Sequence, residues 1–596
     1  MHVVATAGHV DHGKSTLVRA LTGMEPDRFA EEQRRGMTID LGYAWTTLTS
    51  EDGTSRTLAF VDVPGHERFI ATMLAGLGPA PAVMFVVAAD EGWRRQSEEH
   101  LAAVHALGLT HGLLVVTRSD LADPAAAVAE ARARIADSSL GEVPAVAVSG
   151  RTGAGLPELQ RALLELTGRL PEPRRDGRIR LWVDRAFTIR GAGTVVTGTL
   201  GSGMLRVGDP LQLGSRTVRV RGLQSLGRDA TEVAAVARVA VNLRGVEVSE
   251  IGRGDALLTP RAWPTSSSVD ARLEPHAGEV RDLPAELVLH LGTAAVPVRL
   301  RPLGGDTARL TLQRALPLEP GDRLVLRDPG RHAVAAGALV LDADPPELRR
   351  RGAAAARAAA LAEVEDADPA AALADQVRRR GAVRRSELEA LGVPTGADAA
   401  VRVSGEWLVD PDLWQRWQQG LTSAVDERAR SHPLDPRLTL EAARRAVAVP
   451  DRELVIAAAA AAGLVYADGR LARPGTGSEL GAAEAGLAEV AAHLTAHPFL
   501  APEKPDLDRW GLGVAELAAA ERTGRLVRLA ADVVLLPSGP AQAMRVLAGL
   551  RQPFTTSEAR QALGTTRRVA IPLLEHLDHR GWTLRLDDGH RRVKGR

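Results

Sequence analysis

The stretch "MHVVATAGHVDHGKSTLVRALTG", residues 1–23, determines how the first part of the chain folds. An apolar run leads directly into the pattern Gly8-x4-Gly13-Lys14-Ser15, and a helical segment follows it. This strand–loop–helix order is typical of a phosphate-binding loop, in which backbone amides and a helix N-terminus surround the phosphates. Apolar strands and helical segments continue to alternate up to residue 172, which predicts a parallel α/β sheet covered by helices.

A second motif, "DVPGH" at residues 62–66, follows the next apolar strand. We expect Asp62 to hold Mg²⁺ through water, while Ser15 and Thr38 bind the same ion directly. Gly65 offers its amide to a γ-phosphate, and its lack of a side chain allows the close approach. His66 is then placed to orient the attacking water, which makes it the expected catalytic residue. The alternative for His66 is a surface histidine after a turn.

The stretch "TRSD", residues 117–120, is the expected base-reading loop. Asp120 can accept hydrogen bonds from N1–H and the exocyclic amine of guanine. These motifs resemble those of translational GTPases, with two departures: Thr117–Arg118 stands where Asn–Lys is usual, and Ser149–Gly150 where Ser–Ala is usual. We therefore expect GTP specificity to rest mainly on Asp120. The residues that the resemblance assigns to GTP are Gly8, His9, Val10, Asp11, His12, Gly13, Lys14, Ser15, Thr16, Thr38, Asp62, Gly65, Thr117, Arg118, Asp120, Ser149 and Gly150.

Composition limits the class of protein. Hydrophobic residues make up 45% of the 596 residues and charged residues 25%, with 74 basic and 74 acidic side chains. These values are ordinary for a folded protein of several domains. The absence of cysteine excludes disulfides, thiolate metal sites and cysteine nucleophiles, and suits a reducing compartment. No apolar run is long enough to span a membrane. We expect a monomeric cytoplasmic protein that does not bind membranes.

Short β runs separated by Gly, Pro and Asp between residues 179 and 345 indicate two β-barrels. The run "RAFTIRGAGTVVTGTL" at 185–200 resembles the second domain of the elongation-factor superfamily, which binds the aminoacyl end of tRNA. By this resemblance the aminoacyl pocket comprises Asp184, Arg185, Phe187 and Arg238. Two arginines suggest an anionic aminoacyl group, and a selenol is ionised at neutral pH whereas a thiol with a pKa of about 8.5 is mostly neutral. Surface arginines, or arginines that bind tRNA phosphate, are the alternative.

The last 250 residues are helical with small hairpins that recur about every 60 residues, which predicts four winged-helix units. Residues 541–596 hold eleven Arg and Lys against five Asp and Glu, so a nucleic-acid contact is expected in the last unit. Within "TTRRVAIPLLEHLDHRGW" (565–582), Pro572 should kink the helix or mark a start later than Thr565. The expected RNA contacts are Arg560, Thr566, Arg567, Arg568 and Arg592; a solvated basic tail is the alternative.

A GTPase domain, two barrels and tandem winged helices together resemble the bacterial selenocysteine-specific elongation factors. The resemblance implies GTP and Mg²⁺ as cofactors, and selenocysteyl-tRNA, an mRNA hairpin and the ribosome as partners. It implies GTP hydrolysis stimulated by the ribosome and delivery of selenocysteine to UGA codons. The fold class is a P-loop α/β GTPase domain, two β-barrels and tandem α+β winged helices. The expected domains are the GTPase domain (1–172), barrels 2 (173–261) and 3 (262–345), a helical linker (346–367) and four winged helices (368–431, 432–476, 477–539 and 540–596).

Two other functions remain open from the sequence. A GTP-controlled winged-helix regulator that binds DNA would explain the C-terminal units but not the arginines of barrel 2. A GTPase subunit of a sulfate-adenylylation enzyme would share the GTPase domain and barrels but would lack the winged helices.

Overall fold

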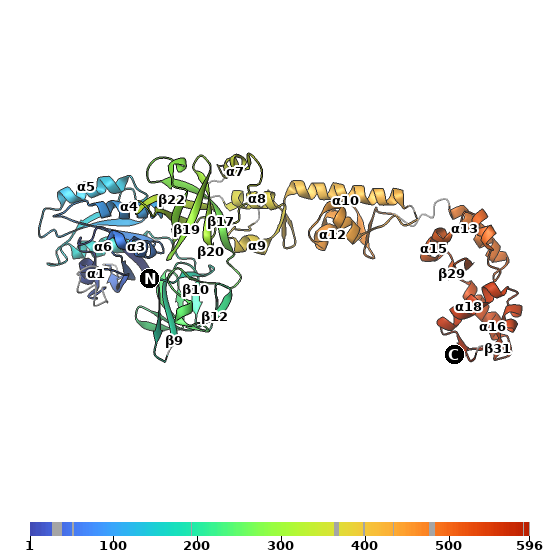
Figure 1. The fold of residues 1–596 in the computed structure, drawn as a ribbon. Helices are drawn as coiled ribbons and strands as arrows, with labels where there is room; N and C mark the ends of the chain where they lie inside the picture. The colour runs from blue at the N-terminus through green and yellow to red at the C-terminus, as the bar shows by residue number, and fades with distance from the viewer. Residues whose placement is uncertain are drawn as a thin grey trace. The chain divides into compact units, whose positions relative to one another are not determined.

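The computed structural model describes residues 1–26, 38–50, 53–191, 193–362, 369–396, 400–432, 434–475, 483–587 and 589–594. The chain divides into two compact units: Met1–Gln376 with Arg384–Asp398, and Val377–Val383 with Ala399–Arg596. Figure 1 shows the α/β domain and the barrels in the blue-to-green part of the chain and the small helical domains in the yellow-to-red part. No helix among the described residues is both long and apolar enough to cross a bilayer.

The α/β domain is built on a six-stranded sheet in the order β2-β3-β1-β4-β5-β6. Strands β1, β3, β4, β5 and β6 run parallel, and β2 pairs antiparallel with β3 at one edge. Every residue of β4 is buried, as expected for a central parallel strand covered on both faces. The strands are β1 (His2–Ala7), β2 (Gly42–Thr49), β3 (Ser55–Asp62), β4 (Ala82–Ala88), β5 (Gly112–Thr117) and β6 (Ala145–Ala147), and the helices are α1 (Lys14–Thr22), α3 (Ile70–Leu77), α4 (Arg95–Ala106), α5 (Ala125–Ala136) and α6 (Leu156–Gly168).

Two β domains follow. The first is an eight-stranded sheet in the order β7-β16-β11-β12-β15-β9-β8, with β13 paired to β12, and a small β10–β14 pair beside it. The second is a closed barrel in the order β17-β20-β19-β18-β21-β22. The strands of the first are β7 (Arg180–Trp182), β8 (Arg185–Ile189), β9 (Gly193–Leu200), β10 (Met204–Arg206), β11 (Pro210–Leu213), β12 (Arg216–Ser225), β13 (Arg228–Ala230), β14 (Glu232–Ala234), β15 (Ala237–Arg244) and β16 (Ala256–Leu258). Those of the second are β17 (Thr265–Pro275), β18 (Glu286–Leu291), β19 (Ala294–Gly304), β20 (Thr307–Pro317), β21 (Arg323–Asp328) and β22 (Ala333–Asp342).

The α/β domain and the closed barrel share part of one core. Val325 and Val334 of the barrel belong to the same buried cluster as Leu101 and Val104 of α4. A Cβ on Gly337 would lie 2.9 Å from Ala106 Cα, so the backbone of β22 approaches α4 closely. Helix α7 (Ala353–Ala362) is tied to the barrel by a buried ion cluster in which Arg357 donates to Asp270 and Asp342.

The second unit carries small sheets of the winged-helix kind, in the orders β23-β25-β24, β26-β28-β27, β29-β30 and β31-β33-β32. In the last winged-helix unit, α17 and α18 form a helix–turn–helix. Helix α18 begins at Arg567, later than Thr565 as the sequence analysis allowed, and continues through Pro572. The predicted fold class is thus confirmed. The helices from residue 369 onward are α8 (Pro369–Arg380), α9 (Arg385–Ala390), α10 (Pro411–Ser431), α11 (Leu440–Val447), α12 (Arg452–Ala461), α13 (Ala483–Ala496), α14 (Lys504–Arg509), α15 (Val514–Arg522), α16 (Gly539–Ala548), α17 (Thr556–Ala562) and α18 (Arg567–His579). Of these, α9 and the part of α8 up to Gln376 belong to the first unit. The strands are β23 (Ala382–Arg384), β24 (Arg402–Ser404), β25 (Trp407–Val409), β26 (Leu438–Thr439), β27 (Val465–Ala467), β28 (Arg470–Ala472), β29 (Val527–Ala530), β30 (Val533–Leu535), β31 (Phe554–Thr555), β32 (Thr583–Arg585) and β33 (His590–Val593).

Candidate functional site

The phosphate-binding loop connects β1 to α1, as the sequence predicts. Gly13 is the N-cap of α1 in the left-handed region, with φ 79°. Gly8 also has a positive φ, and a Cβ there would lie 2.1 Å from the carbonyl oxygen of Val86, so only glycine fits. The ammonium of Lys14 donates to the carbonyl oxygens of Gly8 (3.0 Å) and His9 (2.7 Å). The loop is therefore closed around the lysine that the motif assigns to the phosphates.

Two side chains of α4 support this loop from behind. His100 Nδ1 accepts a hydrogen bond from the Gly8 amide (3.0 Å), and Gln96 Oε1 accepts one from the Val10 amide (3.1 Å). Burial lowers the pKa of His100 to about 3, with smaller contributions from Lys14 and His9, so the ring stays a neutral acceptor. The sequence analysis missed both residues. The available signal was their i, i+4 spacing, which places them on one face of a helix.

The residues expected around Mg²⁺ lie at one end of the loop. Ser15 Oγ and Thr38 Oγ1 are 2.9 Å apart. Asp62 is fully buried at the end of β3, where its Oδ1 accepts from the Thr6 hydroxyl at 2.8 Å. Two hydroxyls and a carboxylate are hard oxygen donors of the kind that Mg²⁺ prefers, so the residues fit the ion. Residues 34–37 of the preceding segment lie outside the described part of the chain.

Gly65 and His66 follow Asp62 in the turn before a short 3₁₀ helix (Glu67–Phe69). A Cβ on Gly65 would lie 2.6 Å from both the ammonium of Lys14 and the amide of Val10, so this backbone touches the phosphate loop. His66 is half-buried, and its Nδ1 accepts from the Arg68 amide at 3.2 Å. The structure thus places the backbone of Gly65 against Lys14. The ring of His66, the next residue, is hydrogen-bonded to the Arg68 amide.

The base-reading loop is tied to the phosphate loop by the two unusual residues. The Thr117 hydroxyl donates to the carbonyl oxygen of His12 at 2.7 Å. The guanidinium of Arg118 pairs with Asp90 (2.9 Å) and Glu91 (2.8 Å) and also donates to the carbonyl oxygen of Asp11. The contacts of Thr117 with His12 and of Arg118 with Asp11 therefore fix the base-reading loop to the phosphate loop, although Thr117 replaces the usual asparagine.

The remaining residues of the base site come from two loops. Asp120 is exposed beyond the end of β5. Ser149 is buried, and its hydroxyl accepts from the Thr152 amide at 3.1 Å. A Cβ on Gly150 would lie 3.3 Å from the methyl group of Thr16, so this turn packs directly on the start of α1.

The predicted aminoacyl pocket corresponds to a cavity of about 240 Å³ between β2 and β3 of the α/β domain and β8, β9 and β15 of barrel 2. Arg185, Phe187 and Arg238 line it. Asp184 lies behind them and accepts two hydrogen bonds from Arg238 and one from the Thr197 hydroxyl (2.6 Å). The structure therefore brings the four predicted residues together, and it neutralises Arg238 with Asp184.

Residues from the α/β domain complete this cavity. The guanidinium carbon of Arg238 lies 3.8 Å from the centre of the Tyr43 ring, and Arg185 pairs with Asp40 at 3.0 Å. Arg253 also pairs with Asp40, at 2.7 Å. Burial alone would raise the pKa of Asp40, but Arg253, a hydrogen bond from the Leu41 amide and Arg185 together outweigh it and lower the pKa. The sequence analysis missed all three residues, because nothing local in the sequence links Asp40 and Tyr43 to barrel 2, or Arg253 of barrel 2 to Asp40.

The predicted RNA contacts lie on the last winged helix. Arg567 and Arg592 are exposed and Arg560 is half-buried. Thr566 is the N-cap of α18, and its side chain makes no capping hydrogen bond. Arg568 instead donates to the carbonyl oxygens of Ala501 (2.9 Å) and Pro502 (2.7 Å) and pairs with Asp532 at 3.4 Å. Arg568 therefore connects α18 to the preceding winged-helix unit.

Three family models match the chain. The Elongation factor Tu GTP binding domain matches residues 1–168. The beta-barrel domain of the selenocysteine-specific elongation factor matches residues 282–347. The winged helix of elongation factor SelB matches residues 545–592.

Relatives and a solved structure extend these matches. The chain is 39% identical to a selenocysteine-specific elongation factor from Desulfomicrobium baculatum over 58% of this chain and 57% of that protein. It is 38% identical to the one from Escherichia coli (strain K12) over 59% and 56%. These alignments thus span little more than half of the relatives' length. Elongation factor Tu 2 of Streptomyces avermitilis is 31% identical over 56% of this chain and 95% of its own length.

The crystal structure of a bacterial selenocysteine-specific elongation factor, EF-Sec, superimposes with a TM-score of 0.74 and 25% identity, covering 100% of both chains. The order of domains, the GTP-binding motifs and these matches agree with one another. The chain belongs to the elongation-factor family of translational GTPases, in its selenocysteine-specific branch.

Proposed function

We propose that this protein is a GTP-dependent elongation factor that carries selenocysteyl-tRNA, binds a selenocysteine-insertion hairpin of the mRNA and delivers selenocysteine to UGA codons on the ribosome. The observation that carries the proposal is the cavity between the GTPase domain and barrel 2, where Arg185 and Arg238 face a space of about 240 Å³. The names of the relatives and of EF-Sec support the same function.

In this proposal GTP lies on the loop of residues 8–16, with its base near Thr117, Arg118, Asp120, Ser149 and Gly150. The Arg118 guanidinium is occupied by Asp90 and Glu91, so only its aliphatic stem remains to cover the base. Specificity for guanine then rests on Asp120. ATP that displaces GTP at equal concentration would contradict this assignment.

Ser15 and Thr38 would hold Mg²⁺ directly and Asp62 would hold it through water; the ion, when bound, neutralises charge on the phosphates. Gly65 offers its amide to the γ-phosphate. His66 orients the attacking water after its ring leaves the Arg68 amide. We propose that contact with the ribosome induces this change, which would make GTP hydrolysis dependent on the ribosome.

The aminoacyl cavity would select a selenolate by its charge. Arg238 is compensated by Asp184, whereas Arg185 shares Asp40 with Arg253. An anionic ligand that pairs with Arg185 therefore lies beside two arginines, Arg185 and Arg253, and one carboxylate, that of Asp40. The neutral hydroxyl of serine cannot gain this charge–charge interaction.

Protection of the aminoacyl ester bond tests the function. We expect GTP-dependent slowing of hydrolysis for selenocysteyl-tRNA and little slowing for seryl-tRNA. Arg185→Gln should weaken the protection of selenocysteyl-tRNA by about tenfold, the loss of one charge-assisted hydrogen bond, and leave seryl-tRNA unchanged. Arg238→Ala is less informative, because it leaves the buried carboxylate of Asp184 unpaired. Equal protection of both tRNAs by the wild-type chain would contradict the proposal.

The last winged helix would bind the mRNA hairpin through Arg560, Thr566, Arg567 and Arg592, mainly by shape and phosphate contacts. Arg568, which the sequence predicts as a fifth contact, is instead held by the carbonyl oxygens of Ala501 and Pro502. Filter binding of the whole chain should favour a hairpin RNA over duplex DNA; the reverse preference would favour a DNA-binding regulator. We further propose a monomeric cytoplasmic protein with the domain boundaries given by the sequence: 1–172, 173–261, 262–345, 346–367, 368–431, 432–476, 477–539 and 540–596.

A further inference from the structure

Helix α4 of the α/β domain touches the phosphate loop with one face and barrel 3 with another. Towards the loop, His100 and Gln96 accept hydrogen bonds from the amides of Gly8 (3.0 Å) and Val10 (3.1 Å). Towards the barrel, α4 packs on β21 and β22 (Figure 1). Both contacts lie on a single helix of 12 residues, so a shift of this helix against the barrel also moves the two acceptors of the loop.

The apolar part of the contact between α4 and barrel 3 is tightly packed. Val104 of α4 shares one buried cluster with Val325 and Val334 of the barrel. A Cβ on Gly337 of β22 would lie 2.9 Å from Ala106 Cα and 3.1 Å from its carbonyl oxygen. These atoms belong to the backbone, which cannot turn aside as the end of a side chain can. Because such interiors are dense and transmit strain, the position of β22 determines the position of α4.

A hydrogen bond adds a polar part to the same contact. His105 Nδ1 accepts from the Ser139 amide at 2.9 Å, so the proton of its neutral ring is on Nε2. This nitrogen donates to Glu274 of β17 at 3.0 Å. Glu274 lies opposite Gly337 in the pairing of β17 with β22. The apolar and polar parts therefore belong to one patch of barrel 3, which faces the C-terminal half of α4.

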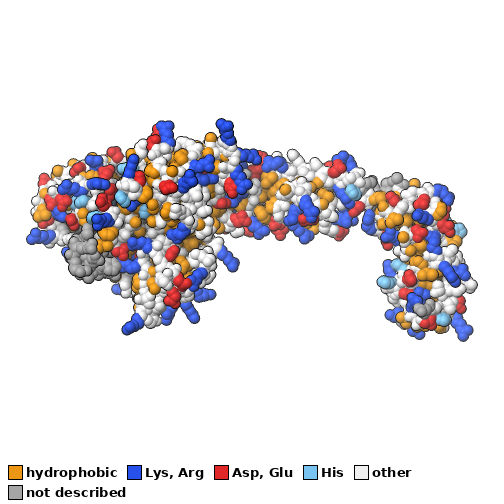
Figure 2. Space-filling model, viewed as in Figure 1, with side chains coloured by type: hydrophobic (Ala, Val, Ile, Leu, Met, Phe, Trp, Pro, Cys, Tyr) orange, Lys and Arg blue, Asp and Glu red, His pale blue; other side chains and the backbone are white. Residues whose placement is uncertain are grey.

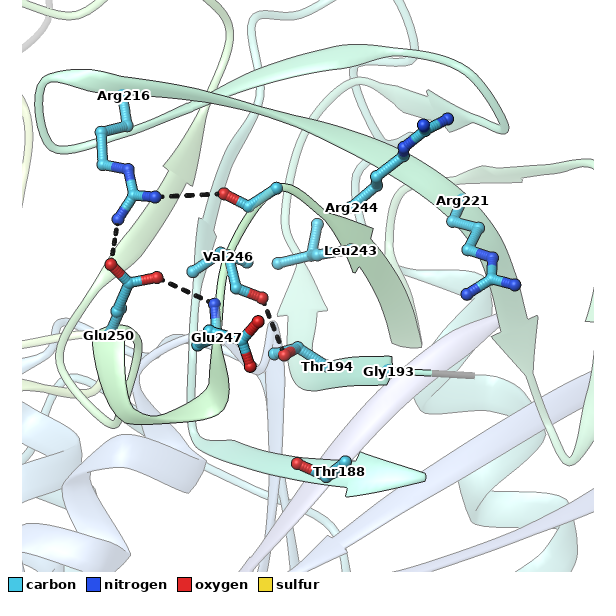
Figure 3. Close-up of a pocket in the computed structure, with 11 residues that line it drawn as sticks. Thr188, Gly193, Thr194, Arg216, Arg221, Leu243, Arg244, Val246, Glu247 and Glu250 are labelled. Atoms are coloured by element: carbon cyan, nitrogen blue, oxygen red, sulfur yellow. Dashed lines mark hydrogen bonds and ion pairs between the residues drawn. The ribbon is translucent and has the colours of Figure 1, made fainter. Parts of the chain in front are cut away.

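Barrel 2 contacts the α/β domain at a different place, at Asp40 and Tyr43 beside the aminoacyl cavity. Figure 2 shows Lys, Arg, Asp and Glu side chains mixed over the barrels, so packing rather than surface charge distinguishes the two. A further cavity of about 550 Å³ on barrel 2 is lined by residues of that barrel alone (Figure 3). Its ion pair between Arg216 and Glu250 stays within the barrel. Barrel 3 is thus the β domain that packs on the helix behind the phosphate loop.

We propose that barrel 3 positions the phosphate loop through α4 and thereby sets the rate at which the nucleotide leaves. The inference concerns control of the nucleotide site and rests only on the GTP-binding part of the proposed function. With the barrel seated on α4, His100 and Gln96 hold the amides of the loop. Hydrogen bonds weaken steeply as their angle and distance depart from the optimum, so a small shift of α4 loosens the loop. Gly337 and Glu274 are then positioning residues for the nucleotide.

The variant Gly337→Ala tests this inference in the full-length protein, because its methyl group pushes β22 away from Ala106. Gly330→Ala is the matched control: Gly330 is exposed between β21 and β22 of the same barrel, and a Cβ there would lie 3.3 Å from the Asp328 carboxylate. Stopped flow measures the release of a fluorescent GDP. We expect release from Gly337→Ala to be about fivefold faster and release from the control to change less than twofold.

A double-mutant cycle separates positioning of the loop from a general loss of stability. If barrel 3 acts through His100, Gly337→Ala should add less than about twofold to the release rate in a His100→Ala background. A full fivefold effect in both backgrounds would show that the contact does not act through His100. Hydrogen exchange of the nucleotide-free chain gives a second measurement. Exchange of residues 8–10 should be about fivefold faster in Gly337→Ala, while that of α6 should stay unchanged.

A milder variant covers the case in which Gly337→Ala does not fold. Glu274→Ala removes the hydrogen bond to His105 from a side chain that is 60% exposed, and it should speed GDP release about threefold. Unchanged release together with unchanged exchange of residues 8–10 would overturn the inference, although GDP binding itself would stand. If the wild-type chain binds no GDP, the nucleotide assignment of the proposed function fails instead. The exchange of residues 8–10 then decides whether barrel 3 positions the loop.

Discussion

The imidazole of His100 supports the nucleotide site although it lies 92 residues from the amide that it binds. Replacing His100 by Ala leaves the Gly8 amide without its buried acceptor, at a cost of about 1–3 kcal/mol. We expect this loss to loosen the phosphate loop and to speed GDP release about tenfold. Stopped-flow release of a fluorescent GDP measures it. His276→Ala, at an exposed position of barrel 3, is the control, and an unchanged release rate in His100→Ala would contradict the role.

At this scale the sequence predicts the residues that touch phosphate but not the residues behind them. Gly8, Gly13 and Lys14 lie in a contiguous motif whose spacing is fixed by the loop. His100 and the Asp40–Arg185 pair, by contrast, join segments 92 and 145 residues apart. Such contacts depend on how helices and barrels pack, and no local pattern encodes that packing.

At the scale of elements, α18 combines two tasks in adjacent arginines. Arg568 donates to Ala501 and Pro502, while Arg567 is exposed. We expect Arg568→Ala to destabilise the C-terminal region by about 2 kcal/mol, as lost hydrogen bonds of a charged group do. Arg567→Ala should leave thermal unfolding unchanged and weaken RNA hairpin binding. Thermal unfolding and filter binding of both variants check this. Equal melting temperatures for the two variants would contradict the structural role assigned to Arg568.

The helix itself could be predicted, whereas the task of Arg568 could not. The apolar positions Val569, Leu573 and Leu577 are all buried, as the helical spacing indicates. They belong to one cluster with Leu487 and Leu517 of the preceding winged-helix unit. A basic residue at the start of a helix is equally compatible with an RNA contact and with a contact between domains. Only the position of the carbonyl groups of Ala501 and Pro502 distinguishes the two.

At the scale of the whole molecule, three buried histidines make stability depend on pH. Burial is the main cause that lowers the pKa of His100 to about 3, and of His12 and His290 to about 4. Their unfolded value is about 6.5. Since the folded pKa lies below the unfolded one, the unfolded chain binds more protons at acid pH. Stability is therefore full above pH 6.5 and is lost as the pH falls towards 4.

We expect the urea midpoint of the nucleotide-free protein to fall between pH 7 and pH 5, because each of these histidines contributes a slope of up to about 1.4 kcal/mol per pH unit. His290→Leu removes one of the three groups. Its ring nitrogen Nε2 has no hydrogen-bond partner among the described residues, so the replacement breaks no contact of that atom. The variant should unfold with a smaller pH dependence than the wild-type protein, whereas His276→Gln, at an exposed site, should keep all of it. A midpoint that stays constant from pH 7 to pH 5 would mean that these histidines are protonated in the folded protein, and the neutral acceptor role of His100 would then fail as well.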